Sequence, residues 1–228
     1  MSVQSPYATP KADVGDGYGD TLRLPAGNLN PWFSMWLQPR ATIQQIVDTN
    51  PERMVLLLAA LGGIAQMLDR ASGQGFGDRM SLEAVLGAAL AVGIISGVIQ
   101  LYVGAALLYW TGSWIGGTAS TANIRAAVAW SNVPLVWGML VWLPGIALFG
   151  HELFTDDMPR TAADPRLLMA FVGLGLVSLV IGVWSVVALI KALAQVQGFS
   201  AWRALGNVVL MLLVIFVPLA VFFGLMAL

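Results

Sequence analysis

The chain has little charge for its length and no cysteine at all. Only 10% of its 228 residues are Asp, Glu, Lys or Arg, and the net charge is −1. The absence of cysteine excludes disulfides, thiol chemistry and thiolate-bound metal, and the single histidine, His151, cannot form a His-rich metal site. Because so balanced a charge builds no broad basic surface, we expect no nucleic-acid partner. We also expect no cofactor.

Apolar residues make up 58% of the sequence, which is typical of a membrane protein. Residues 1–30 are rich in Gly, Pro, Ser and Asp and are predicted to form a flexible cytoplasmic tail. Residues 31–228 are predicted to form one membrane domain. We therefore expect an all-α integral membrane protein with five transmembrane helices, at about 51–70, 81–110, 122–149, 166–194 and 201–228.

A short helix is predicted at 39–48, between an aromatic cluster at 32–37 and the first span. Pro39 opens it, and Ile43, Ile46 and Val47 share one face. This pattern predicts an interfacial amphipathic helix that lies on the membrane. A linker packed against the helix bundle is an equal alternative, because so short a segment discriminates poorly between the two.

The basic residues predict an orientation, because cytoplasmic loops carry an excess of Lys and Arg. With the N-terminus inside, seven fall on the cytoplasmic side and four outside; without the two in the distant tail, the count is five against four. The inner residues are Lys11, Arg23, Arg40, Arg53, Arg125, Lys191 and Arg203, and the outer ones are Arg70, Arg79, Arg160 and Arg166. We expect a cytoplasmic N-terminus and a C-terminus outside.

The third predicted span contains the most polar stretch that the sequence places in lipid. No Asp, Glu, Lys or Arg lies deep in any predicted span, which weighs against an ion-coupled pump. Gln100 and Asn132 are expected at similar depths, within hydrogen-bonding reach of each other. The candidate membrane polar site comprises Gln100, Trp130, Ser131, Asn132 and Pro134.

A structural role for Asn132 is the favoured alternative to a solute contact. Pro134 lacks an N–H and would kink the span, so a nearby polar side chain is needed to satisfy freed backbone groups.

Small residues recur four apart at Ala89, Gly93 and Gly97, and again at Ser178 and Gly182. Such rows allow close helix packing in lipid, either in a dimer or within one bundle. Packing within the bundle is favoured, since every helix must find partners there.

An acidic loop lies between the third and fourth spans, where Glu152, Asp156 and Asp157 follow His151. These side chains could hold a divalent cation outside the membrane, but a solvated acidic loop is favoured because such clusters are ordinary on loops.

The order of these features resembles the Yip domain family, named for Ypt-interacting proteins. The resemblance rests on short motifs: WLQPR at 36–40, GGT at 116–118, AWSNVP at 129–134 and GFSAWRA at 198–204. It implies five spans. Eukaryotic members are Golgi and endoplasmic-reticulum proteins that associate with Rab-type GTPases and with each other. The short tail and Ala/Gly-rich spans here resemble bacterial members, so the GTPase partnership is not carried over.

The resemblance implies a non-enzymatic protein of the bacterial cytoplasmic (inner) membrane, with no established catalytic residues. It would act through self-association or binding of another membrane protein, in membrane organisation or a trafficking-like process. The candidate cytoplasmic face for a partner or lipid comprises Trp32, Trp36, Arg40, Arg125, Lys191 and Arg203. The alternative is a small permease or channel with an uncharged pathway past Gln100, Ser131 and Asn132.

Overall fold

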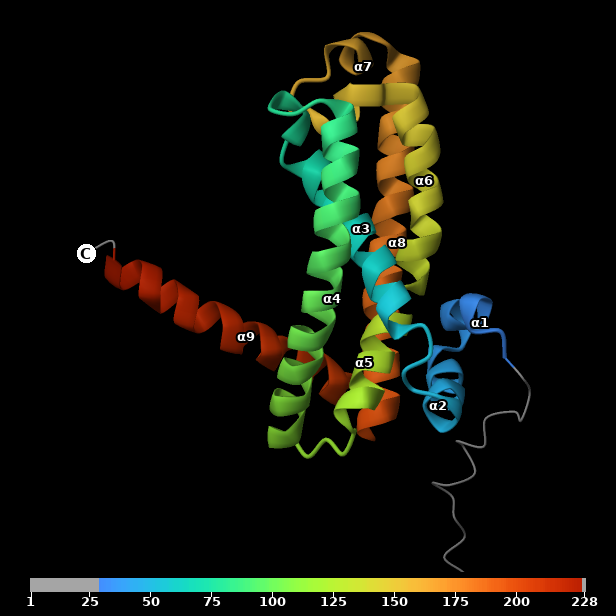
Figure 1. Cartoon of the computed structure of the whole chain (residues 1–228), viewed down its shortest axis with the longest axis vertical. Helices are drawn as coiled ribbons and strands as arrows, with labels where there is room; N and C mark the ends of the chain where they lie inside the picture. Colours follow the sequence, from blue (N-terminus) through green and yellow to red (C-terminus); the bar gives the residue numbers. More distant parts are fainter. Residues whose placement is uncertain (1–28, 227–228) are drawn as a thin grey trace, which may run out of the picture.

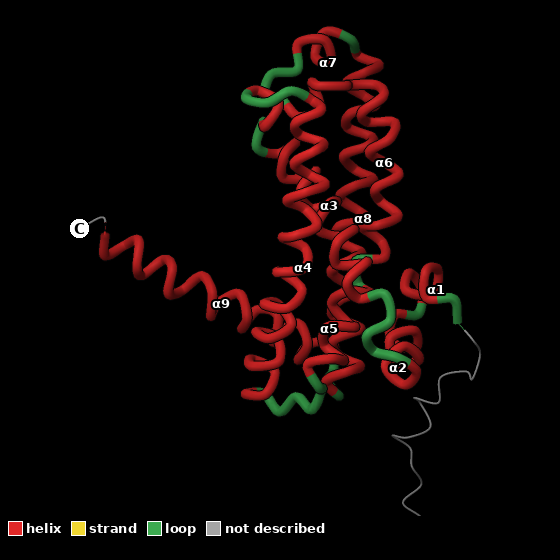
Figure 2. The backbone as a smooth tube through the Cα atoms, viewed as in Figure 1, coloured by secondary structure: helices red, strands yellow, loops and turns green. Residues whose placement is uncertain are grey.

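The computed structural model describes residues 29–226, and every regular element in this range is a helix (Figure 2). Five segments are long and apolar enough to cross a membrane: Val55–Gly73, Leu82–Trp114, Thr121–Phe154, Pro165–Gln197 and Ala201–Met226. The predicted all-α class with five spans is therefore confirmed. Nearly all of the predicted tail lies outside the described residues.

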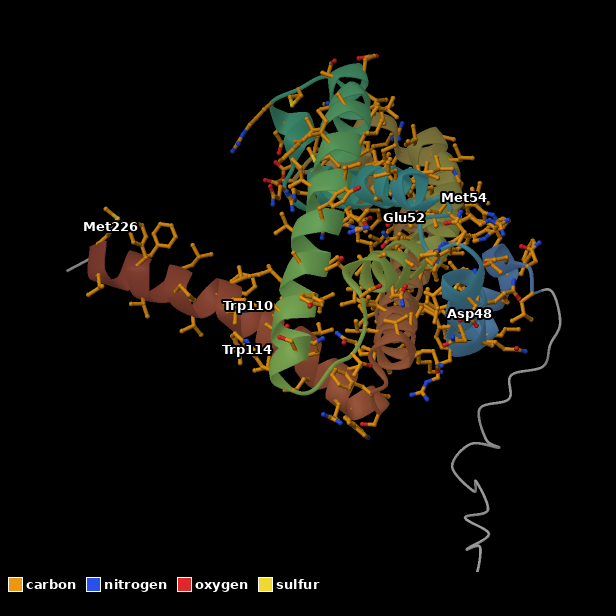
Figure 3. The ribbon with its side chains drawn as sticks, turned by 60° about the horizontal axis from the view of Figure 1, so that its bottom comes forward. Asp48, Glu52, Met54, Trp110, Trp114 and Met226 are labelled. Atoms are coloured by element: carbon orange, nitrogen blue, oxygen red, sulfur yellow. The ribbon has the colours of Figure 1, made fainter. Side chains whose placement is uncertain are left out.

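The first span, α3 (Val55–Gly73), begins four residues later than predicted. Asn50 does accept a bond from the Glu52 N–H, but residues 51–54 form a turn and Met54 has a φ of +55°. A tertiary contact keeps residues 51–54 out of the helix, since the Glu52 carboxylate pairs with Arg125. Figure 3 shows Glu52 and Met54 between α2 and α3.

The second span, α4 (Leu82–Trp114), is capped by Ser81 and packs along α3. Glycines allow the two backbones to touch: a Cβ on Gly63 would lie 2.6 Å from the Gly97 Cα atom, and one on Gly93 would lie 2.8 Å from the Ile64 Cα atom. The Ala89–Gly93–Gly97 row thus packs inside the bundle, as the favoured interpretation predicted.

The third span is divided into α5 (Thr121–Trp130) and α6 (Val133–Phe149), and the fourth is α8 (Pro165–Gln197). One end of the bundle carries η2 (Phe76–Asp78), η3 (Gly150–Phe154) and α7 (Pro159–Ala163), and we call it the α7 end (Figure 1). We call the opposite end the α2 end. All basic residues predicted on the outer side belong to segments at the α7 end.

The fifth span, α9 (Ala201–Met226), leaves the bundle at a steep angle from the α2 end (Figure 1). Its far end lies level with the middle of α4 rather than with α7. Figure 3 shows Met226 projecting away from all other helices, while Trp110 and Trp114 of α4 lie near the start of α9. Among its described residues, only Ala204 and Asn207 are buried.

Two short helices precede the bundle: α1 (Pro31–Leu37) and α2 (Pro39–Thr49), which matches the helix predicted at 39–48. The α2 apolar face is buried against the bundle through Ile43 and Ile46. By contrast, α1 exposes 61% of Phe33 and 82% of Leu37. Of the two alternatives for residues 39–48, packing against the helix bundle therefore describes α2. The apolar surface that can face lipid belongs to α1.

Candidate functional site

The polar stretch of the third span forms a break between two helices rather than a kink in one. α5 ends at Trp130, Ser131 and Asn132 form the link, and Pro134 lies in the first turn of α6. Proline is well tolerated there because first-turn N–H groups have no partner within the helix. The continuous helix predicted over 122–149 is therefore wrong at this point.

Trp130 fixes the break against the rest of the bundle. Its side chain is fully buried, packs edge-on against Trp32 at 6.0 Å, and donates from Nε1 to the Arg53 carbonyl at 3.2 Å. The Ser131 hydroxyl donates to the Val128 carbonyl at 2.7 Å. Trp130 and Ser131 thus have structural roles in holding the link.

Asn132 does not have the structural role that was favoured from the sequence. It occupies the position before α6, but its side chain makes no capping hydrogen bond. The amide instead lies against α3, where a Cβ on Gly62 would come within 2.6 Å of its Nδ2 atom. Gly62 therefore provides the space that lets Asn132 lie between the helices.

Asn132 lines a cavity of about 340 Å³, which we call the polar cavity. Its polar lining residues come from α3, α4, the α5–α6 link and α8, and they are Gln66, Gln100, Ser131, Asn132 and Ser185. Gln100 and Asn132 both line this cavity, which agrees with the similar depth predicted for them. No hydrogen bond joins these two side chains within residues 29–226, so the predicted contact between them is absent.

One buried polar group of this cavity is left unsatisfied by the protein itself. The Ser185 hydroxyl is buried and has no hydrogen-bond partner within the described part of the chain. Leaving such groups unpaired in a membrane interior costs free energy, so they require water or another polar molecule. The arrangement can bind a small uncharged hydrogen-bonding molecule, since no ionised side chain lines the cavity.

Arg125, in the candidate cytoplasmic face, is engaged within the chain. Its guanidinium pairs with Glu52 and lies 5.4 Å from the Tyr102 ring centroid. It joins α5 to the turn before α3. These contacts limit the ability of the Arg125 side chain to bind a partner.

Arg203 is likewise held, by the Ile115 carbonyl and the Phe199 ring, 4.7 Å from its centroid. Beside it lies a buried network that sequence reasoning missed: Asn207 accepts from Thr111 Oγ1 at 2.6 Å and donates to the Leu108 carbonyl at 3.1 Å. This network fixes the base of α9.

Glycines in and beside the GGT motif make room for the same network. A Cβ on Gly112 would lie 2.9 Å from the Asn207 Nδ2 atom, and one on Gly117 would lie 2.8 Å from the Gln197 Cδ atom. Thr118 Oγ1 reaches the Gln197 carbonyl at 3.5 Å. The GGT and GFSAWRA motifs are thus neighbours in space.

The other proposed cytoplasmic residues are less constrained. Arg40 and Lys191 are half-buried and form no ion pair within residues 29–226. The half-buried Trp36 accepts at its carbonyl from the Trp184 Nε1 at 3.0 Å, which attaches α1 to α8. Trp32 is half-buried as well, and Arg203 is exposed although it is bonded within the chain.

The acidic loop does not assemble a cation site within the described residues, where no group of three His, Asp or Glu side chains gathers. Glu152 instead accepts from the Thr161 hydroxyl at 2.8 Å and from the Arg160 and Thr161 N–H groups, closing the loop onto α7. His151 Nε2 lies 3.0 Å from the Met80 carbonyl.

Asp69 is an acidic residue that the predicted span boundaries concealed. It lies one turn before the end of α3, and it shares a narrow space with Ser178, near the middle of α8. Asp69 is exposed and lies near the end of the span rather than deep within it.

Comparison with protein-family models matches residues 33–222 to the Yip1 domain. Comparison with curated proteins and with solved structures gave no match. The matched range runs from α1 to α9, and so includes the α5–α6 break and the base of α9. Since the match covers most of the sequence, this chain belongs to the Yip1 domain family.

Proposed function

We propose that this chain is a non-enzymatic membrane protein that acts by self-association, in which α9 packs against a second copy of the chain. The observation that carries the proposal is the position of α9. Helices α3 to α8 find partners within the chain, whereas α9 beyond Asn207 exposes apolar side chains along its length. A helix in this position can pack on another copy without unpacking its own bundle.

The direction of α9 supports this proposal because polar contacts at its base set it. Asn207, Thr111 and the Leu108 carbonyl form a buried network at that base. Arg203 adds a bond to the Ile115 carbonyl. These bonds hold the first two turns on the end of α4 and lead the rest of the helix outward.

Cysteine cross-linking tests the proposal, since the natural chain has no cysteine to remove. Phe216→Cys places a thiol in the exposed part of α9, and Val180→Cys is the matched control on the exposed face of α8. We expect oxidation in native membranes to give a covalent dimer with Phe216→Cys and mainly monomer with Val180→Cys. Equal yields from both positions would contradict a role for α9.

A second partner surface is proposed at the α2 end, where Arg40, Lys191 and Trp36 remain accessible. Arg suits lipid phosphate or a carboxylate on another membrane protein. With the cytoplasmic orientation proposed above, this surface would face anionic lipid headgroups.

Passage of a small uncharged solute is a second candidate function, and the polar cavity supports it. Gln100, Ser131 and Asn132 line one cavity beside a broken helix, an arrangement that lines pathways in transporters. It ranks second because no charged side chain lines the cavity and because binding alone does not require transport. Accessibility of the cavity to a water-soluble reagent tests it, as described below.

A further inference from the structure

A second pocket, separate from the polar cavity, lies nearer the α7 end between α3, α6 and α8. Its volume is about 250 Å³. The residues that give it chemical character are one carboxylate, two hydroxyls and three aromatic rings: Asp69, Ser72, Ser178, Trp142, Phe149 and Phe171. We call it the Asp69 pocket.

The Asp69 carboxylate has no cationic partner in the structure. The ion pairs within residues 29–226 are Arg125 with Glu52 and Arg160 with Glu152, and no basic side chain lines the pocket. Asp69 is exposed one turn before the end of α3, so its unpaired charge lies where a ligand can reach it. A bound cation would supply the missing charge.

The aromatic rings identify the kind of cation. Phe149 and Phe171 meet edge-on at 5.7 Å, and Trp142 stacks on Phe154 at 5.7 Å with an interplanar angle of 11°, so these contacts orient the rings. Aromatic faces attract organic ammonium groups. A metal ion would need several more oxygen ligands, and no group of acidic or His side chains provides them in the described residues.

We propose that the Asp69 pocket binds an ammonium group, with Asp69 as its counter-ion and the aromatic rings around it. The group can come from a lipid headgroup or from a free amine. This inference does not depend on self-association through α9. The pocket has open space for such a ligand, because a Cβ on Gly73 or Gly175 would meet no atom within 4 Å.

Native mass spectrometry of the full-length protein in detergent tests this inference. The probes are dioleoyl-phosphatidylethanolamine, which carries an ammonium, and dioleoyl-phosphatidylglycerol, which has the same chains without one. We expect wild type to retain the ethanolamine lipid about tenfold more than the glycerol lipid, a ratio equal to about 1.4 kcal/mol. Asp69→Asn should abolish the preference, and Asp157→Asn, an exposed acid outside the pocket, should keep it.

Two further variants separate loss of the pocket from loss of the fold, because one fills the pocket and the other adds the same side chain outside it. Gly175 lines the pocket and Gly173 does not, yet a Cβ at either would enter open space. Gly175→Leu should lose the preference and Gly173→Leu should keep it. Displacement of the lipid by millimolar ethanolamine would identify a site that recognises the ammonium alone, and its absence a site that also requires the lipid chains.

Two results would overturn the inference: wild type that shows no preference between the lipids and no binding of ethanolamine, or Asp69→Asn that binds the ammonium lipid as wild type does.

Discussion

At Asn132, a side-chain amide faces the polar cavity without a capping bond to its own helix. Because polar groups in a membrane interior need a partner, we expect water in the cavity. Asn132→Cys and Gln100→Cys should therefore react with a small membrane-impermeant thiol reagent applied from the predicted cytoplasmic side. Labelling followed over time by mass spectrometry measures both rates.

Two positions calibrate this experiment. Thr118→Cys lies in the exposed loop before α5 and should label fast, whereas Ala129→Cys is fully buried and should be protected. Rapid reaction at 100 and 132 would strengthen the solute-pathway candidate. Rates as slow as at 129 would show a dry, closed cavity and leave association as the only candidate.

Gly97 tests the close contact between α3 and α4. A methyl group there would lie 2.9 Å from the Gly63 Cα atom, so Gly97→Ala must push the helices apart, at an expected cost of about 1–3 kcal/mol. Gly87→Ala, on the same helix in open space, should leave stability unchanged or slightly raised. Thermal unfolding in detergent compares the two. Equal stability of the two variants would contradict the claim that Gly97 is needed for the close approach of α3 and α4.

The attachment of α9 to α4 depends on the hydrogen bonds of Asn207. Asn207→Leu removes its bonds with Thr111 and with the Leu108 carbonyl, each worth about 0.6 kcal/mol in a membrane protein. We expect faster hydrogen exchange across the first turns of α9. Asn123→Leu, which lies outside this network, is the matched control. Unchanged exchange in Asn207→Leu would mean that apolar packing alone directs α9.

The apolar runs were enough to predict the class of fold and the number of spans, because each span in lipid must be a helix long enough to cross. The start of the second span at 81 was also predicted to within one residue, since the cap formed by Ser81 is a local contact. The α3 start was missed because the pairing of Glu52 with Arg125 competes with the local helix signal. That pairing joins residues far apart in sequence.

The candidate site was predictable only in part, for a similar reason. Asn132 and Gln100 stood out as polar residues within apolar runs, and they do share a cavity. Ser185 and Gln66 did not stand out, because only packing shows which face of a helix meets a cavity. Asn207 was missed because its partner Thr111 belongs to α4, which was predicted to end earlier.

For the whole molecule, the count of basic residues predicts that the α2 end lies in the cytoplasm. Asp157→Cys should then react with an impermeant reagent in intact cells, because it lies in the loop at the α7 end. Thr118→Cys should react only after permeabilisation. The reverse pattern would invert the proposed orientation.

If two copies of this chain associate through α9, the number of copies in each assembly can be counted. Single-molecule photobleaching of fluorescently tagged full-length protein in lipid vesicles, at a low ratio of protein to lipid, gives the number of subunits in each spot. We expect mainly two bleaching steps for the wild type, and fewer two-step spots for Asn207→Leu. Single-step spots throughout would contradict association through α9.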